Sequence, residues 1–148
     1  WWVVGIKGPE YALYDGCQRF IYTTLGQTEI RAQNSVPLTL NDEMRICKNE
    51  GKFTRTDNGI MELVYENWEG YFETWQFTHR FENSMLAYVC SSSNSEETHD
   101  YGAFILSRVP LAELGAEELA ALVQGLRDAY HLELDELTPV KIVDCPNP

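Results

Sequence analysis

Apolar and polar residues alternate through most of the first 109 positions, and this period of two predicts short β-strands. Turn residues separate the segments, as in Asp57-Asn58-Gly59, a sequence typical of a tight hairpin. Some segments join in the fold, which leaves about eight or nine strands in an antiparallel meander. The polar residues 91–97 are expected to form a mobile loop. The segments are 1–7, 17–25, 28–33, 36–40, 44–48, 52–56, 60–65, 71–81, 85–92 and 101–109.

After Leu111 the apolar residues recur at steps of three and four, which predicts one amphipathic helix over residues 117–130. Its apolar stripe has to cover a surface, and the outside of the sheet is the surface available. The sequence therefore predicts a single all-β domain over residues 1–148. We expect an eight-stranded antiparallel up-and-down barrel, 1–109, with a C-terminal α-helix and return segment, 110–148, packed on its wall. The stripe contains Leu114, Leu119, Leu122, Val123, Leu126 and Tyr130.

Composition narrows the class of protein. The 148 residues include 23 Asp and Glu against 11 Lys and Arg, so the formal net charge is −12, and 44% of the residues are hydrophobic. A chain of this length builds one sizeable core. The acidic surface repels polyphosphate, so nucleic acid is not expected as a partner, and no apolar run is long enough for a transmembrane span. Since the chain begins at Trp1, it is either a processed protein or lacks flanking sequence.

The four cysteines of the chain fit an oxidising compartment, where two disulfides would form in any of three connectivities. Four buried free thiols are the alternative. Neither the cysteines nor the three histidines have the spacing of metal ligands, so no metal site is predicted. These residues are Cys17, Cys47, Cys90 and Cys145, and His79, His99 and His131.

Residues 71–81 form the strand with the most informative chemistry. Because side chains alternate across a strand, its odd positions, which are mostly aromatic, are expected to point into the barrel and to bring Glu73 and His79 with them. An apolar interior raises the pKa of a carboxyl group, so Glu73 is either an acid facing a ligand or a group in a wet barrel mouth. The predicted ligand-binding residues are Tyr71, Trp75, Phe77, His79 and Tyr101, and Glu73 is the candidate catalytic residue.

Several stretches together resemble the lipocalin domain of the violaxanthin de-epoxidase family, and the resemblance covers essentially the whole chain. The first is Trp1-Trp2-Val3-Val4, followed by residues 8–18, which read Gly-Pro-Glu-Tyr-Ala-Leu-Tyr-Asp-Gly-Cys-Gln. The others are Glu73-Thr74-Trp75, Asp100-Tyr101-Gly102-Ala103, Ser107-Arg108 and Asp144-Cys145-Pro146.

This resemblance implies two structural links and a cellular location. One link is a disulfide between Cys17 and Cys145, which leaves Cys47 and Cys90 as the remaining pair. The other is a contact of Arg108 with the ring of Trp1, which seals one end of the barrel. The resemblance also implies a protein of the chloroplast thylakoid lumen whose barrel holds a xanthophyll.

The same resemblance also implies an enzymatic activity, but only some of the family's catalytic residues have counterparts in this sequence. Members of the family reduce epoxy-carotenoids with ascorbate, using an acidic residue at the position of Glu73, a Gln from an earlier strand and a Tyr near the end of the last strand. The last strand here reads Phe104-Ile105-Leu106-Ser107, without that Tyr. The earlier strand reads Cys47-Lys48-Asn49-Glu50, without that Gln.

Three functional hypotheses follow. The first is a lipocalin-like protein that binds a carotenoid or another apolar molecule, or serves as an accessory subunit of a photosystem or antenna complex. The second is a xanthophyll de-epoxidase or related enzyme that uses Glu73 as its acid and requires ascorbate. The third is a barrel filled by its own side chains. Trp68, outside the alternation, is expected to be a residue of the barrel lip or a partner contact.

Overall fold

The computed structural model describes residues 1–8, 16–56, 59–93, 96–142 and 144–145. The first part of the expected hairpin, Asp57-Asn58, lies outside these ranges. The strands are β1 (Trp2–Lys7), β2 (Arg19–Thr24), β3 (Glu29–Leu40), β4 (Glu43–Arg55), β5 (Met61–Tyr65), β6 (Tyr71–Arg80), β7 (Ser84–Ser93) and β8 (Glu96–Ser107). Short 3-10 helices at Leu111–Glu113 and Leu134–Glu136 flank the helix α1 (Ala116–Tyr130), and a two-residue strand, β9 (Thr138–Pro139), follows.

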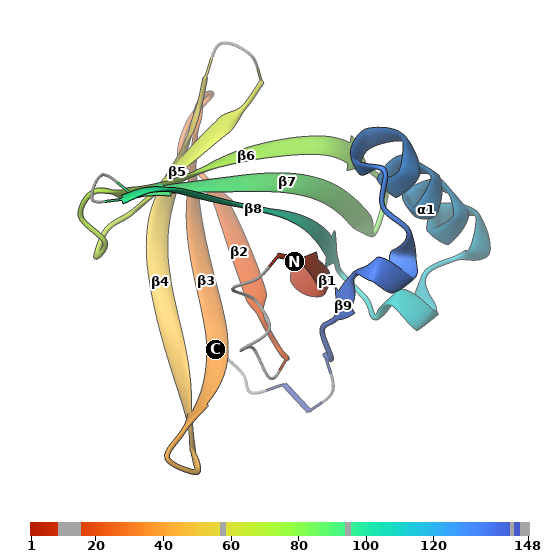
Figure 1. Cartoon of the computed structure of the whole chain (residues 1–148), viewed down its shortest axis with the longest axis horizontal. Helices are drawn as coiled ribbons and strands as arrows, with labels where there is room; N and C mark the ends of the chain where they lie inside the picture. The colour runs from red at the N-terminus through yellow and green to blue at the C-terminus, as the bar shows by residue number, and fades with distance from the viewer. Residues whose placement is uncertain (9–15, 57–58, 94–95, 143, 146–148) are drawn as a thin grey trace.

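The sheet closes on itself. Each of the strands β1 to β7 pairs antiparallel with the next strand, and β8 pairs with β1 (Figure 1). β9 adds to the free part of β1 at Gly5 and Ile6. The predicted eight-stranded antiparallel barrel with a C-terminal helix on its wall is therefore confirmed.

Some strands are longer than the sequence pattern indicates. The segments 28–33 and 36–40 are both parts of β3, and 44–48 and 52–56 are both parts of β4, because an unbroken ladder pairs the two strands from Glu29 to Leu40. The loop predicted over 91–97 is mostly strand, since β7 continues to Ser93 and β8 begins at Glu96. That prediction is wrong because polar residues also form ladder hydrogen bonds, which hydropathy does not reveal.

The two ends of the barrel are built differently. Trp1 and the turns between β2 and β3, β4 and β5, and β6 and β7 lie at one end, which we call the Trp1 end. The turns between β3 and β4 and between β5 and β6 lie at the other end, which we call the far end. At the Trp1 end, the guanidinium of Arg108 lies over the indole of Trp1, 4.7 Å from its centroid, as the resemblance implied.

Two apolar clusters lie on opposite sides of the barrel wall. The inner one fills the barrel around Trp75. The outer one lies between the wall and α1, where Leu122 and Leu126 pack with Leu86 and Ile105 of β7 and β8, so the predicted stripe covers the outer wall. In the part of the chain that the structure describes, no helix has both the length and the apolar character needed to cross a membrane.

A disulfide joins Cys17, just before β2, to Cys145, beyond α1, as the resemblance implied. Cys47 and Cys90 are free thiols, so the expected second disulfide is wrong. Cys47 belongs to β4 and Cys90 to β7, and these strands are not neighbours in the sheet. The closed barrel thus holds the two thiols on separate parts of its wall.

Candidate functional site

A layer of aromatic side chains crosses the barrel interior at Trp75 of β6, which is 1% exposed. Its ring lies 5.2 Å from that of Phe104, 5.4 Å from Phe20 and 5.6 Å from Phe53, measured between centroids. Offset and edge-to-face contacts at such distances are favourable. The barrel's own side chains therefore fill this level, and a ligand would have to lie on the far-end side of it.

Glu73 stands on that side of the aromatic layer, two residues before Trp75, and is 7% exposed. Its carboxylate accepts hydrogen bonds from Trp75 Nε1 at 2.7 Å, from the Tyr71 hydroxyl at 2.9 Å and from the Tyr65 hydroxyl at 3.2 Å. Burial raises the pKa of Glu73, and these three hydrogen bonds oppose the rise. A carboxyl group in this state can donate a proton at a pH where an ordinary Glu is ionised.

Three more polar side chains are buried in the barrel with an atom that has no hydrogen-bond partner. The atoms are Gln18 Oε1, the Tyr22 hydroxyl and Asn34 Oδ1, and Gln18 and Asn34 are 2% and 8% exposed. Burial, and after it the charge of Glu73, raise the pKa of Tyr22, so its hydroxyl remains protonated. Ala32 pairs with Tyr22, and Asn34 is the next inward residue toward the far end. Sequence reasoning missed these residues, although alternation along β2 places Gln18 and Tyr22 on one face.

No family model matches this chain, and no curated protein matches its sequence. Solved structures do match it. Lobster apocrustacyanin A1 superposes with a TM-score of 0.70 at 19% identity, over 99% of this chain and 78% of that one. A dog lipocalin allergen has a TM-score of 0.65 at 12% identity, over 100% and 96%. The chain has a lipocalin-like fold. Aphrodisin from the female hamster agrees, with a TM-score of 0.64 at 14% identity over 99% and 97%.

His79, one of the predicted ligand-binding residues, lies on the outer face of this lipocalin-like barrel. The pairing of β6 with β7 shifts between Phe77 and His79, so a bulge reverses the faces of the residues that follow. His79 stacks on Phe81 beneath α1, where a Cβ added to Gly125 would lie 3.2 Å from His79 Cγ. The predicted inward positions of His79 and Phe81 are wrong, because a strict period of two does not reveal a bulge.

The other predicted ligand-binding residues divide between the two sides of the aromatic layer. Tyr71 is half-buried on the far-end side, where it donates to Glu73. Phe77 packs on the Trp1 side, 5.8 Å from the ring of Trp75. The side chain of Tyr101 lies outside the part of the chain that is described.

Trp68 is exposed between β5 and β6 at the far end of the lipocalin-like barrel. Its ring lies 5.2 Å from that of Tyr71 and 5.3 Å from that of Tyr65, the two tyrosines that donate to Glu73. This position agrees with the expectation of a lip residue. The indole covers the tyrosines from the solvent side and therefore shields the Glu73 cluster.

The acid and base groups implied by the de-epoxidase resemblance are present only in part. Glu73 occupies the position of the acid, but Phe104 of the last strand belongs to the aromatic layer. Tyr65 and Tyr71 instead bring two phenol hydroxyls to Glu73, from β5 and β6. Among the residues that the structure describes, no three His, Cys, Asp or Glu side chains are grouped to hold a metal ion.

Proposed function

We propose that the barrel binds one apolar small molecule of the carotenoid class, whose polar end group enters from the far end and faces Glu73. One observation carries this proposal: unpaired polar atoms of Gln18, Tyr22 and Asn34 are buried in the same interior as an aromatic layer. Each unpaired buried atom costs about 1–3 kcal/mol of folding stability. A hydroxyl or carbonyl group of a ligand would supply the missing partners.

The shape of the interior favours a ligand that enters only in part. Because the barrel is filled at Trp75, a long polyene would place one end ring above the aromatic layer and leave the rest near the exposed indole of Trp68. A protonated Glu73 would donate to an oxygen of that ring. The bovine odorant-binding protein, whose name states that it binds odorants, has the same fold at 12% identity and supports an apolar ligand.

The proposal extends to where the protein works. The resemblance to the violaxanthin de-epoxidase family motivates a location in the chloroplast thylakoid lumen and a photosystem or antenna complex as a partner. Fractionation of thylakoids followed by detection of the chain with an antibody tests both. Recovery of the chain outside the chloroplast would contradict this part of the proposal and leave the binding site untouched.

Paired carotenoids test the binding site. Zeaxanthin carries a hydroxyl group on each end ring, whereas β-carotene carries none. The difference between their affinities, measured by quenching of tryptophan fluorescence, therefore gives the contribution of the hydroxyl group. We expect Asn34→Leu to lower the affinity for zeaxanthin by about fivefold to tenfold, the effect of one lost hydrogen bond, and to leave the affinity for β-carotene nearly unchanged. Gln33→Leu, at the neighbouring position on the outer face of β3, where the amide donates to Glu50, is the matched control. Absence of quenching by either carotenoid would favour the filled barrel.

A second function is favoured by the raised pKa of Glu73, which suits a general acid. In a de-epoxidase, ascorbate would supply two electrons and two protons overall, both C–O bonds of the epoxide would break to leave a C=C double bond, and the oxygen, protonated by Glu73, would leave as water. We expect the chain alone to show no turnover of violaxanthin with ascorbate at about pH 5, because the Gln and the last-strand Tyr are missing. Turnover that disappears in Glu73→Gln, while violaxanthin still binds, would establish the enzyme instead.

A further inference from the structure

The outer face of the barrel wall is only partly covered by α1. Over one part of β7 and β8, Leu86 and Ile105 are buried under the helix. Two residues away on each strand, the next outward-facing pair is Tyr88 of β7 and Ala103 of β8. α1 ends at Tyr130, where His131 adopts a left-handed conformation with φ 55°, so the helix stops before it covers this second part.

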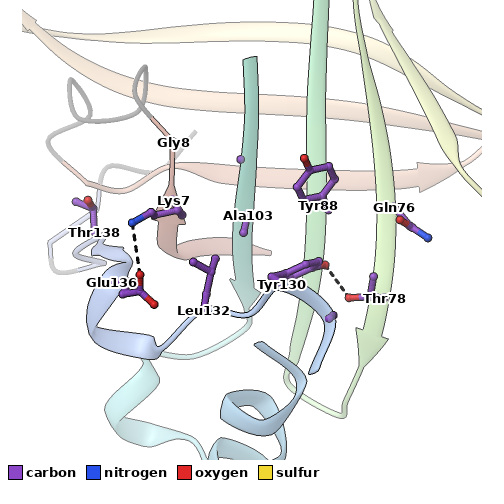
Figure 2. A pocket seen from close by; sticks show the side chains of 12 residues that line it. Lys7, Gly8, Gln76, Thr78, Tyr88, Ala103, Tyr130, Leu132, Glu136 and Thr138 are labelled. Atoms are coloured by element: carbon purple, nitrogen blue, oxygen red, sulfur yellow. Dashed lines mark hydrogen bonds and ion pairs between the residues drawn. The ribbon is translucent and has the colours of Figure 1, made fainter. Parts of the chain in front are cut away.

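A pocket of about 1060 Å³ occupies the space that the helix leaves open (Figure 2). Its floor is the outer face of β6 to β8, which carries Gln76, Tyr88 and Ala103 there. The last turn of α1 and the return segment after it form the opposite walls, through Ala129, Leu132 and Thr138. Residues from separate parts of the chain therefore line one pocket that is open to solvent on one side, and its volume is close to the upper end of the usual range for ligand pockets, roughly 300–1000 Å³.

The walls of this pocket combine aromatic rings with two fixed polar pairs. The rings of Tyr88 and Tyr130 lie 5.9 Å apart, and the Tyr130 hydroxyl is 2.7 Å from Thr78 Oγ1. On the other side of Ala103, the ammonium of Lys7 lies 4.0 Å from the carboxylate of Glu136 (Figure 2). The hydrogen bond fixes Tyr130, and the ion pair sets charges of both signs at the opposite rim.

We infer that this outer pocket is a second binding site, for a flat conjugated molecule that carries polar groups at two opposite edges. The body of the molecule would lie on Ala103 and against the ring of Tyr88, where small residues leave room for it. One polar edge would meet the Thr78 and Tyr130 hydroxyls, and the other would meet Lys7 and Glu136. The near cancellation of charge between Lys7 and Glu136 favours a neutral ligand.

The second site is separate from the interior of the barrel. Ala87 and Val89, the neighbours of Tyr88 on β7, belong to the inner cluster, whereas Tyr88 points to the outer pocket. The sheet itself therefore divides the two volumes, and neither site needs the other to be occupied. Binding outside the barrel thus stands whether or not a carotenoid enters it.

Nile red is a suitable probe, because it is neutral, flat and conjugated, has a carbonyl and an amine at opposite edges, and fluoresces in apolar surroundings. Ala129 is exposed on the pocket side of α1, so Ala129→Trp would fill the volume without disturbing the core. Ala120, exposed on the same helix and absent from the pocket lining, gives the matched control Ala120→Trp. A third variant, Ala103→Phe, fills the pocket from its floor.

Titration of these variants decides the question. We expect Ala129→Trp and Ala103→Phe to lower the affinity of the outer pocket for Nile red by at least about tenfold. The affinity of Ala120→Trp should stay within about twofold of that of the unmodified chain. The dissociation constant for zeaxanthin should be the same in Ala129→Trp and in Ala120→Trp, each of which adds one tryptophan to the fluorescence signal, and this result separates the outer site from the barrel. If Nile red fails to bind, or binds all variants with equal affinity, the outer site is refuted. Should Ala103→Phe fail to fold, the comparison of the two helix variants still decides.

Discussion

Glu73 is held in a balance that makes the stability of the protein depend on pH. Removal from water favours its protonated form, while the hydrogen bonds from Trp75, Tyr71 and Tyr65 favour its charged form. Burial is the larger of these effects, so the pKa of Glu73 is raised. The folded state therefore keeps a proton that the unfolded chain has already released.

The first prediction concerns this proton. An acid with a raised pKa stabilises the fold most below the ordinary Glu value, about 4.3, and its contribution falls as the pH rises toward the raised pKa. Glu73→Gln removes the pH-dependent contribution of this carboxyl group to the free energy of unfolding. We therefore expect the variant to gain stability relative to the unmodified chain when the pH rises from 4 to 7. Urea unfolding at both pH values measures the difference. An equal difference at both would show that Glu73 is not held protonated, and Glu62→Gln, on the outer face of β5, is the control.

A second residue-scale prediction concerns the contact between Arg108 and Trp1. The guanidinium lies over the ring but is largely exposed, so Arg108→Ala should lower the free energy of unfolding by about 0.5–1 kcal/mol. Arg55→Ala, at an exposed position on β4, should change it by less than about 0.5 kcal/mol. Thermal or urea unfolding of the two variants makes the comparison, and equal stabilities would show that the contact contributes nothing.

At the scale of elements, β6 shows which side-chain positions the sequence can predict and which it cannot. Alternation correctly placed Glu73 and Trp75 inside the barrel, because each position keeps its face as long as the ladder is regular. The bulge after Phe77 ends that regularity, and His79 then packs beneath α1. Such an insertion depends on tertiary contacts with the helix, which local hydropathy does not record.

The contact between β6 and α1 gives a prediction for Gly125, which is buried in the helix. A Cβ at this position would lie 3.0 Å from Leu86 Cδ1 and 3.2 Å from His79 Cγ, so the helix approaches the wall closely here. Gly125→Leu should push α1 off the wall and lower the free energy of unfolding by about 1–3 kcal/mol, despite its better helix propensity. Ala120→Leu, on the exposed side, should change it by less than about 0.5 kcal/mol. Equal unfolding curves for the two variants would contradict this packing.

At the scale of the whole molecule, the chain is closed by a link between its two ends. The peptide N–H of Cys17 donates to the carbonyl of Lys141 at 2.8 Å, and the Cys17–Cys145 disulfide lies beside this contact. Gly16 has φ +122°, and a Cβ there would lie 2.6 Å from the Lys141 oxygen, so the close approach requires glycine. The spacing of the cysteines alone left three connectivities open, and only the resemblance selected this one.

The disulfide yields the last stability prediction. The two cysteines are 128 residues apart, so their link restricts almost the whole unfolded chain. Cys145→Ser should lower the free energy of unfolding by about 2–5 kcal/mol. A Cys47→Ser, Cys90→Ser double variant removes two free thiols and should cost less, about 1 kcal/mol. Unfolding in urea without reductant compares them, and an unchanged midpoint in Cys145→Ser would contradict the role assigned to the link.

The polar atoms inside the barrel make the strongest case for a ligand, and occupancy of the native protein tests it most directly. The chain should be purified from its natural source without detergent, extracted with organic solvent, and the extract separated by chromatography with absorbance and mass detection. We predict close to one carotenoid or similar apolar molecule, bearing a hydroxyl or carbonyl group, per chain. An extract with no such molecule, from protein that also fails to take up zeaxanthin, would contradict ligand binding and establish the filled barrel.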